Sequence, residues 1–424
     1  MDILRSLVGM GLLLVIAYAL SVNRRAIRMR TLLAAMLLQV AVGALVLFLP
    51  QGSAALSSAA RGVNDVLEMG NHGVSFMFGG LVDDKMFQLF GGHGFIFALR
   101  VLPMIIFVTA LIAVLYHIGI MKWVINVVGA ILGKLLDVSR IEACSAVATT
   151  FIGQSEIPAF VKPFISRMTG AELFAVMSSG MASIAGSVLV GYIGLGVKLE
   201  YLLAASFMAV PGGLLFAKII FPTTETSTAD FTHLTAGEHR SANVIDAAAS
   251  GAMTGLRIAV SVGAMLIAFI GLIALLNAMI GNVAGLFGYS NLTMQGILGH
   301  IFSPLAWLIG VPWQNAQIAG NFIGEKMILN EFVAYADLSP YLKSANDVLA
   351  AGLTVLDPRT IAIVSFALCG FSNFSSIAIL AGGFSAVAPE RRAEVTRYGL
   401  RVVAASTLSN LMSAAIAGIF LSLH

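Results

Sequence analysis

The stretch "FIGQSEIPAF", residues 151–160, places three polar side chains inside a segment that otherwise has the composition of a membrane interior. Gln154, Ser155 and Glu156 follow an apolar run and precede Pro158. Proline lacks an amide hydrogen and disfavours helical backbone at the residue before it. A glycine just before the polar group permits a turn. The stretch therefore predicts a helix, a polar tip and a second helix.

The composition of the whole chain indicates a polytopic, all-α membrane protein. Of its 424 residues, 58% are apolar and 11% are charged, whereas a soluble domain carries about 25% charged residues. The mean hydropathy is +0.94. A net charge of +3 without a basic tract argues against a nucleic-acid partner. The two cysteines, Cys144 and Cys369, lie in apolar segments and do not indicate a disulfide framework.

Long uncharged runs predict about eight transmembrane helices, because about 20 apolar residues are needed to cross the hydrocarbon. Arginine clusters follow the first run and precede the last, and basic loops favour the cytoplasm. Both termini are then expected on the opposite side. The predicted crossings are 6–23, 31–49, 101–121, 173–197, 201–217, 258–282, 360–389 and 402–423.

Two segments are too short and too polar to cross, and we expect them to form re-entrant hairpins. They are residues 142–168 and residues 315–343, the latter around "GEKMILNEFVAYADLSP". Apolar runs of 10–14 residues are typical of such segments. Each is followed by an apolar helix with a polar interruption, "GMASIAGS" (180–187) or "CGFSNFSS" (369–376). Paired broken helices in two halves favour a transporter with internal repeats and a site at the midplane.

The polar tip of the first segment offers both donors and acceptors. Gln154 can donate and accept, Ser155 can do either, and an ionised Glu156 accepts. This set suits a ligand such as a nucleobase edge. Carboxylates at membrane depth are expensive and usually functional. The alternative is that Glu156 pairs with Lys162 or Arg167 in a loop at the membrane surface.

The second half carries a similar set of polar residues. Glu331 stands between apolar residues, so we expect it to accept hydrogen bonds from sugar hydroxyls; the alternative is an ion pair with Lys326. Phe371 could stack on a planar ring or pack like any membrane phenylalanine. Asn373 and Ser376 could contact a ligand or join neighbouring helices by hydrogen bonds.

The small residues of "MASIAGS" (181–187) allow two interpretations. They could permit close packing of helices. Alternatively, the helix unwinds there and its carbonyl oxygens coordinate a hard cation such as Na⁺.

Three motifs together resemble the concentrative nucleoside transporter family. They are "GQSE" followed by proline, "NEFVAY" and "CGFSNFSSI", which occur in this order along the chain. The length resembles the short, eight-helix bacterial members. The resemblance implies a homotrimer in the bacterial inner membrane, with a scaffold domain and a transport domain. It also implies two re-entrant hairpins, internal inverted repeats, and cation-coupled import of nucleosides by an elevator-like alternating access, without an enzymatic activity or a cofactor.

The resemblance also implies roles for individual residues. At the first hairpin tip three residues would bind the nucleobase beside Val188, while Glu331 would hold the ribose. The implied substrate residues are Gln154, Ser155, Glu156, Val188, Glu331, Phe371, Asn373 and Ser376. The implied cation ligands are Thr149, the Ile152 carbonyl, Ser183 and the Ile184 carbonyl. Sodium-coupled relatives commonly carry asparagine where Thr149 stands, so the coupling ion stays open between Na⁺ and H⁺.

We expect four segments in the chain. Residues 1–141 form most of the scaffold, and residues 142–221 form the first repeat of the transport domain. Residues 222–302 hold a polar linker (222–247), an interfacial segment and a scaffold helix, and residues 303–424 form the second repeat. A further helix over 54–70 is expected on the membrane surface. The alternatives are a transporter of another small polar solute, an ion channel, or an intramembrane enzyme that uses Glu156 and Glu331.

Overall fold

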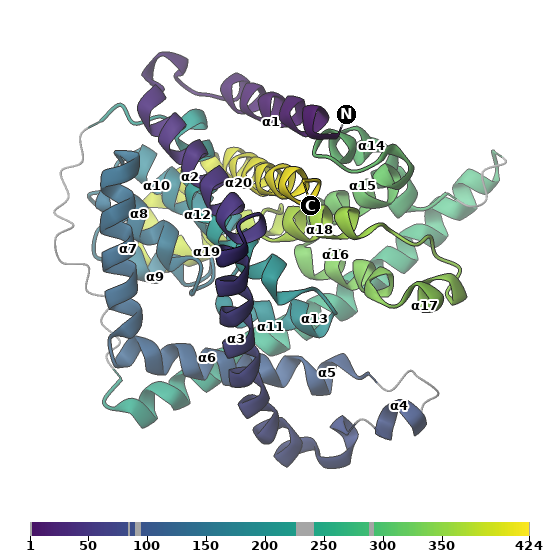
Figure 1. The fold of residues 1–424 in the computed structure, drawn as a ribbon. Helices are drawn as coiled ribbons and strands as arrows, with labels where there is room; N and C mark the ends of the chain where they lie inside the picture. Colours follow the sequence, from purple (N-terminus) through teal and green to yellow (C-terminus); the bar gives the residue numbers. More distant parts are fainter. Residues whose placement is uncertain (1, 84, 90–94, 226–240, 288–291, 424) are drawn as a thin grey trace.

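The computed structural model describes residues 2–83, 85–89, 95–225, 241–287 and 292–423. All secondary structure in these ranges is helical (Figure 1). Six helical segments in them are long and apolar enough to cross a membrane. They are α2 (Met29–Leu47), α5 with α6 (Phe97–His117), α10 with α11 (Gly170–Gly194), α12 (Leu199–Ile220), α13 (Val244–Gly285) and the segment Pro389–Leu421 that contains α20 (Arg392–Leu421).

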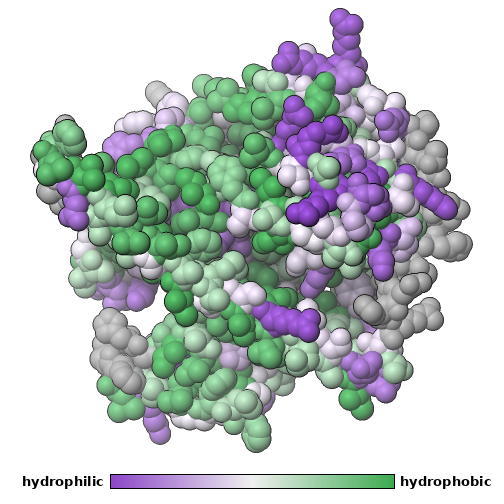
Figure 2. All heavy atoms as spheres, turned by 180° about the vertical axis from the view of Figure 1, so that it is seen from behind, coloured by the Kyte–Doolittle hydropathy of each residue, from purple (hydrophilic) through white to green (hydrophobic). Residues whose placement is uncertain are grey.

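The other two predicted crossings are shorter helices. The first is α1 (Asp2–Ala19), which ends four residues before the predicted run does. The second is a helix broken in two, α18 (Pro358–Leu368) and α19 (Ser375–Val387). All eight predicted runs therefore correspond to helices, and Figure 2 shows apolar side chains over much of one face of the molecule.

Three regions have features that the sequence did not predict. The surface segment 54–70 lies within a longer helix, α3 (Pro50–Phe78). The helix predicted at 258–282 begins at Val244 and includes the end of the predicted linker, most of which lies outside the described residues. Helices α14 (Met294–Leu308) and α15 (Trp313–Ile328) are apolar and bent by 115° relative to each other.

Helices α6 (Leu102–His117) and α13 form a closely packed pair (Figure 1). Gly251 and Gly255 of α13 stand one turn apart and face this contact. An added Cβ at Gly255 would lie 2.7 Å from the Ile106 Cα atom, and one at Gly251 would lie 2.8 Å from that of Ala110. Small residues thus let the two backbones approach closely.

Two helical hairpins lie in the body of the protein. The first consists of α8 (Arg140–Ala148), the tip 149–156 and α9 (Ile157–Val161). The second consists of α15 and α16 (Glu331–Leu338), joined by two residues. In each hairpin the two helices pack against each other. Each is followed by a broken helix and then by a long one, α12 or α20.

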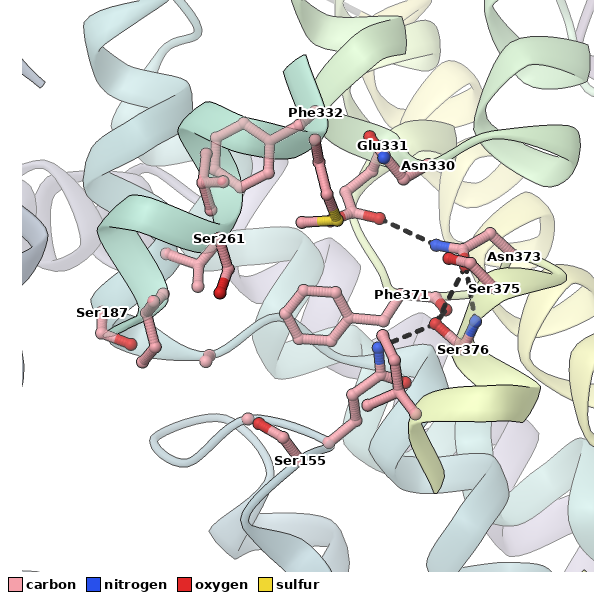
Figure 3. A pocket seen from close by; sticks show the side chains of 18 of the residues that line it. Ser155, Ser187, Ser261, Asn330, Glu331, Phe332, Phe371, Asn373, Ser375 and Ser376 are labelled. Atoms are coloured by element: carbon pink, nitrogen blue, oxygen red, sulfur yellow. Dashed lines mark hydrogen bonds between the residues drawn. The ribbon is translucent and has the colours of Figure 1, made fainter. Parts of the chain in front are cut away.

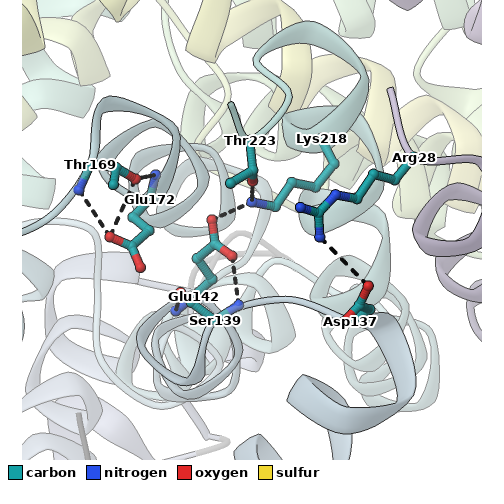
Figure 4. Close-up of polar contacts among 8 residues, drawn as sticks. All are labelled: Arg28, Asp137, Ser139, Glu142, Thr169, Glu172, Lys218 and Thr223. Atoms are coloured by element: carbon teal, nitrogen blue, oxygen red, sulfur yellow. Dashed lines mark hydrogen bonds and ion pairs between the residues drawn. The ribbon is translucent and has the colours of Figure 1, made fainter. Parts of the chain in front are cut away.

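Polar contacts fix the base of the first hairpin (Figure 4). Ser139 and Glu142 form a capping box at the start of α8. The Glu142 carboxylate also accepts hydrogen bonds from Lys218 Nζ near the end of α12 and, at 3.0 Å, from the Ser139 amide. Lys218 Nζ also donates a hydrogen bond to Thr223 Oγ1, at 2.6 Å. A buried glutamate therefore joins the hairpin to α12.

The two broken helices meet at their interruptions. Helix α10 (Gly170–Ala182) ends where Ser183 becomes extended, and α11 (Gly186–Gly194) begins three residues later. The break between α18 and α19 contains Gly370 at φ +157°. A Cβ there would lie 2.4 Å from Asn410 Oδ1, so only glycine fits without a shift. The Phe371 amide donates to the Ser183 carbonyl at 3.4 Å.

Asn410 of α20 links the two interruptions. Its Nδ2 donates to the carbonyl oxygens of Ala182 at 2.7 Å and Cys369 at 2.8 Å, which are the last residue of α10 and the residue after α18. Its Oδ1 accepts from Lys326 Nζ of α15 at 2.8 Å. The freed carbonyls at both broken ends are thereby satisfied inside the membrane.

The remaining elements connect these units. They are η1 (Arg24–Ala26), η2 (Gly79–Val82), α4 (Lys85–Leu89), α7 (Ile120–Leu136), η3 (Ser339–Leu342), α17 (Ala345–Ala350) and η4 (Pro389–Arg391).

Candidate functional site

Five segments that are distant in the sequence enclose a cavity of about 410 Å³ (Figure 3). They are the first hairpin tip, the start of α11, the middle of α13, the second hairpin tip and the break between α18 and α19. This volume lies within the usual range for small-molecule sites. The structure brings all eight predicted substrate residues to this cavity: Gln154, Ser155, Glu156, Val188, Glu331, Phe371, Asn373 and Ser376.

The first hairpin tip contributes a hydrogen-bond acceptor that has no partner. Gln154 is buried, and its Nε2 donates to Ser376 Oγ at 2.7 Å (Figure 3). Its Oε1 is buried and has no hydrogen-bond partner. Glu156 accepts from the Gly153 amide at 3.2 Å. Because buried polar atoms are normally paired, the free Gln154 oxygen indicates a place for a donor on a ligand.

The second hairpin tip places a carboxylate beside an open donor. Glu331 is 4% exposed, and it accepts from Tyr192 Oη and from Asn373 Nδ2, both at 3.1 Å. Asn330 caps α16, with its Oδ1 accepting from the Val333 amide at 2.9 Å. Its Nδ2 is buried and unpaired. A ligand hydroxyl could therefore donate to Glu331 and accept from Asn330.

The break between α18 and α19 holds its polar side chains in fixed positions. Asn373 Oδ1 accepts from Ser375 Oγ at 2.7 Å and from the Ser376 amide at 2.9 Å. Ser376 Oγ lies 2.7 Å from the Phe371 carbonyl oxygen. The Phe371 ring extends into the space between the two hairpin tips (Figure 3). The break thus offers a flat apolar face beside organised polar groups.

Neither simple ion-pair interpretation of the two glutamates fits the structure. Lys326 is buried and donates its hydrogen bonds to the Ala367 carbonyl at 2.7 Å and to Asn410 Oδ1, not to Glu331. Lys162 and Arg167 are exposed, whereas Glu156 lines the cavity. Both glutamates therefore face the site.

The predicted cation ligands lie between the first hairpin and the first broken helix. Ser183 Oγ donates to the Thr149 carbonyl at 3.0 Å, so two of the four predicted residues are in contact. Thr149 Oγ1 donates to the Ala146 carbonyl at 2.8 Å, which leaves its lone pairs for another partner. Ile152 lies in the hairpin tip that begins at Thr149, and Ile184 lies in the helix break that begins at Ser183. These oxygens are of the type that a hard cation prefers.

Sequence reasoning missed the contribution of α13 to the cavity. Arg257 and Ser261 of this helix line it, together with three apolar residues of the same helix. Asn330 and Phe332 were also missed, although they flank Glu331 in the sequence. The signal for α13 was Arg257, a charge at the edge of an apolar run. A charged residue in a spanning helix normally faces a cavity or a partner.

Together, the fold and the cavity define a membrane carrier for a small polar molecule. Two hairpin tips and two helix breaks meet around one cavity, as in secondary transporters with discontinuous helices. The apolar wall with a few placed polar groups suits a compact ligand with donors and acceptors.

Comparisons with known proteins show the family to which the chain belongs. The model of the Na⁺-dependent nucleoside transporter C-terminus matches residues 201–418, that of its N-terminus matches residues 8–81, and a nucleoside-recognition "Gate" model matches residues 98–199. The chain belongs to the Na⁺-dependent nucleoside transporter family.

Relatives and solved structures cover the chain from end to end. The putative nucleoside permease NupX of Escherichia coli is 52% identical, and the alignment covers 100% of both chains. The nucleoside permease NupC of Helicobacter pylori is 47% identical over 99% of this chain and 98% of its own. CNTnw in an inward-facing substrate-bound state is 55% identical, with a TM-score of 0.94 over 100% of this chain and 99% of the other.

The family confirms several expectations from the sequence. The protein is a nucleoside transporter and not an enzyme. It is a polytopic helical protein of the bacterial inner membrane. The resemblance to concentrative nucleoside transporters is confirmed as well.

Proposed function

We propose that the protein is a cation-coupled symporter that imports nucleosides by alternating access. The observation that supports this most directly is the meeting of both hairpin tips and both helix breaks at one cavity. These four elements belong to the proposed transport domain, and each contributes a wall of this cavity.

The substrate would span the two tips. Gln154, Ser155 and Glu156 would bind the nucleobase edge next to Val188, with the free Gln154 Oε1 as an acceptor. Phe371 would lie against the base, where stacking is worth about 1–3 kcal/mol.

The other end of the substrate would face the second hairpin. Glu331 would accept hydrogen bonds from the ribose hydroxyls, and a hydrogen bond to a charged group is worth about 1.5–3 kcal/mol. Asn373 and Ser376 would assist by holding Glu331 and Gln154 in place, as their present contacts do. The unpaired Asn330 amide would donate to a hydroxyl oxygen.

The coupling ion would be Na⁺ or H⁺. A sodium ion would be held by Thr149, Ser183 and the carbonyls of Ile152 and Ile184, and the contact between Ser183 and Thr149 supports this grouping. Bound there, it would supply positive charge that fixes the first hairpin tip. Because such coupling is reciprocal, nucleoside binding would tighten cation binding by the same factor.

The moving and fixed parts of the transporter would alternate along the sequence. Residues 142–221 and 303–424 would form the transport domain, and residues 1–141 and 222–302 the scaffold of a homotrimer. The closely packed α6–α13 pair supports a rigid scaffold. The transport domain would move against it like an elevator, so that Arg257 and Ser261 of α13 would stay behind while the other walls of the cavity travel.

Uptake into proteoliposomes tests this function. Radiolabelled uridine and adenosine are offered under an imposed sodium gradient and then under an imposed proton gradient. We expect accumulation under one of them, and the gradient that drives it names the coupling ion. Glu331→Gln and Glu156→Gln should each abolish uptake while the protein still assembles.

Glu390→Gln provides the matched control, because Glu390 is exposed and does not line the cavity. It should transport like the wild type. Wild-type uptake in both pocket variants would refute the assignment of these residues. An absence of uptake in the wild type under either gradient would refute nucleoside symport itself.

A further inference from the structure

Helix α13 brings one charged side chain to the cavity. Arg257 lines the cavity together with Ser261 and three apolar residues of the same helix, which are Ile258, Val262 and Met265. These positions follow the spacing i, i+1, i+4, i+5 and i+8, which corresponds to one face of an α-helix. Figure 3 shows the Ser261 side chain directed into the cavity. Arg257 stands about one turn before it on the same face.

The guanidinium group of Arg257 is available to a ligand. Among the residues that the structure describes, its side chain forms no hydrogen bond, ion pair or ring contact. The residue is exposed at a wall of the cavity. A charged residue in a spanning helix normally faces a cavity or a partner, and a guanidinium offers five N–H donors. A ligand in the cavity would supply the missing acceptor.

The other charged side chains at the cavity are acceptors. Glu156 of the first hairpin tip and Glu331 of the second line the same cavity, and Gln154 Oε1 is buried there without a partner. Arg257 is the one basic residue among the described residues of the cavity wall. The cavity therefore offers oxygen atoms to the N–H groups of a ligand and a single guanidinium to its oxygen atoms.

The position of Arg257 along α13 places it away from the second hairpin. Later residues of the helix, Leu266 and Ile267, line a separate cavity together with Ala336 of the second hairpin. Arg257 precedes Leu266 by nine residues, which corresponds to about 14 Å of helix. In the proposed function the ribose faces Glu331 of the second hairpin. Arg257 would therefore lie nearer to the nucleobase than to the ribose.

We propose that Arg257 donates a hydrogen bond to an oxo group on the outer edge of the nucleobase, so that the protein prefers oxo bases to amino bases. This proposal rests on the proposed binding of the nucleobase at the first hairpin tip. Arginine commonly donates to the oxo oxygen of guanine. Uracil, hypoxanthine and guanine carry an oxo group beside a ring N–H. The oxo oxygen accepts from Arg257, while the ring N–H donates to the Glu156 carboxylate or to Gln154 Oε1.

Cytosine and adenine present the reverse pattern. Each carries an amino group where the oxo group stands, beside a ring nitrogen that has no hydrogen. The amino hydrogens would then face the guanidinium hydrogens of Arg257, and the ring nitrogen would face the Glu156 carboxylate. Polar groups on both sides would be left unpaired, which is costly in an enclosed site. Sites that hydrogen-bond their substrate reject analogues that cannot make those bonds.

Equilibrium binding of two matched nucleoside pairs to the purified protein tests the proposal. Uridine and cytidine share one ring and the same ribose, and differ in the exchange of the oxo for the amino pattern. Inosine and adenosine differ in the same way. In the wild type, we expect the dissociation constant of the oxo nucleoside to be lower by about tenfold in each pair. Equal affinities or the reverse order in either pair would overturn the proposal.

The variant Arg257→Gln tests whether this side chain causes the preference. A glutamine amide both donates and accepts, so it pairs with either pattern. The ratio of the two dissociation constants should fall toward one in each pair, through weaker binding of uridine and inosine. Arg392→Gln is the matched control, because Arg392 is exposed and does not line the cavity, and it should keep the wild-type ratios. Wild-type ratios in Arg257→Gln would overturn the role of Arg257.

A second variant keeps the test available if Arg257→Gln does not assemble. Arg257→Met places an apolar side chain without a donor in a membrane helix, and it should lower both ratios toward one as well; unchanged ratios would again count against Arg257. Failure of the wild type to bind any of the four nucleosides would refute the nucleoside site itself. Binding without discrimination would leave that site intact and overturn the preference alone.

Discussion

The two hairpins each bury a glutamate in their first helix, but they neutralise it differently. Glu142 of the first hairpin is 1% exposed and is paired with Lys218, which belongs to α12 (Figure 4). Glu325 of the second hairpin is 0% exposed, and neither of its carboxylate oxygens has a hydrogen-bond partner among the described residues. The glutamate of the first hairpin thus has a counter-charge from a neighbouring helix, whereas that of the second hairpin has no hydrogen-bond partner. A buried ion pair of this kind is suited to anchoring.

The two hairpin tips also differ in the origin of the donors that hold their glutamates. Glu331 of the second tip is held by two donors from other segments, Tyr192 and Asn373. Glu156 of the first tip accepts from Gly153 within its own turn. The glutamate of the second tip is therefore fixed by other segments before a ligand arrives, whereas that of the first tip is held only within its own turn.

The largest expected effect comes from breaking the anchor of the first hairpin. Lys218→Met leaves the buried Glu142 carboxylate without its cation, which typically costs about 3–5 kcal/mol. We expect the free energy of unfolding in detergent to fall by about this amount, as measured by denaturant titration. The double variant with Glu142→Leu should recover most of the loss. A loss below about 1 kcal/mol in the single variant would show that this pair is no anchor.

A smaller effect is expected at the residue that joins the two halves. Asn410→Ala leaves the carbonyls of Ala182 and Cys369 and the amine of Lys326 with fewer partners, and each unpaired buried group costs about 1–3 kcal/mol. Partial relaxation should reduce the total, so we expect a loss of about 2–4 kcal/mol in the same titration. Ser409→Ala is the control, since the Ser409 Oγ atom has no partner. Equal stability of the two variants would show that Asn410 does not link the two helix breaks.

The smallest effect on stability is expected at the base of the second hairpin. Glu325→Leu replaces an unpaired carboxyl group by an apolar side chain, and such exchanges are often neutral or stabilising. At acidic pH we expect the free energy of unfolding to change by less than about 1 kcal/mol. A cost equal to that of Lys218→Met would contradict the contrast between the hairpins.

The sequence predicted most of the helices, because long apolar runs and their interruptions are local signals. It also predicted residues that reach the cavity, since Gln154, Glu331 and Asn373 are polar groups where an apolar side chain would be expected. The roles of these residues stay predictions. Polar residues in a membrane segment are informative on their own, before any contact is known.

What the sequence did not predict depends on contacts between distant segments. Arg257 and Ser261 reach the cavity because α13 crosses it, and no local pattern reports that crossing. The pairing of Glu142 with Lys218 joins residues 76 positions apart. Glu325 stands within the second predicted hairpin but was not singled out from the sequence, because only packing shows that its carboxyl group is buried.

The single asparagine between the broken helices has a mechanical consequence. Because Asn410 holds the ends of α10 and α18 together, the two interruptions would shift as one block in the proposed transport cycle. The base end and the sugar end of a bound nucleoside would then be uncovered at the same moment, rather than one after the other. Release of the nucleoside would then be a single step, without a stable intermediate in which only one end of the substrate is uncovered.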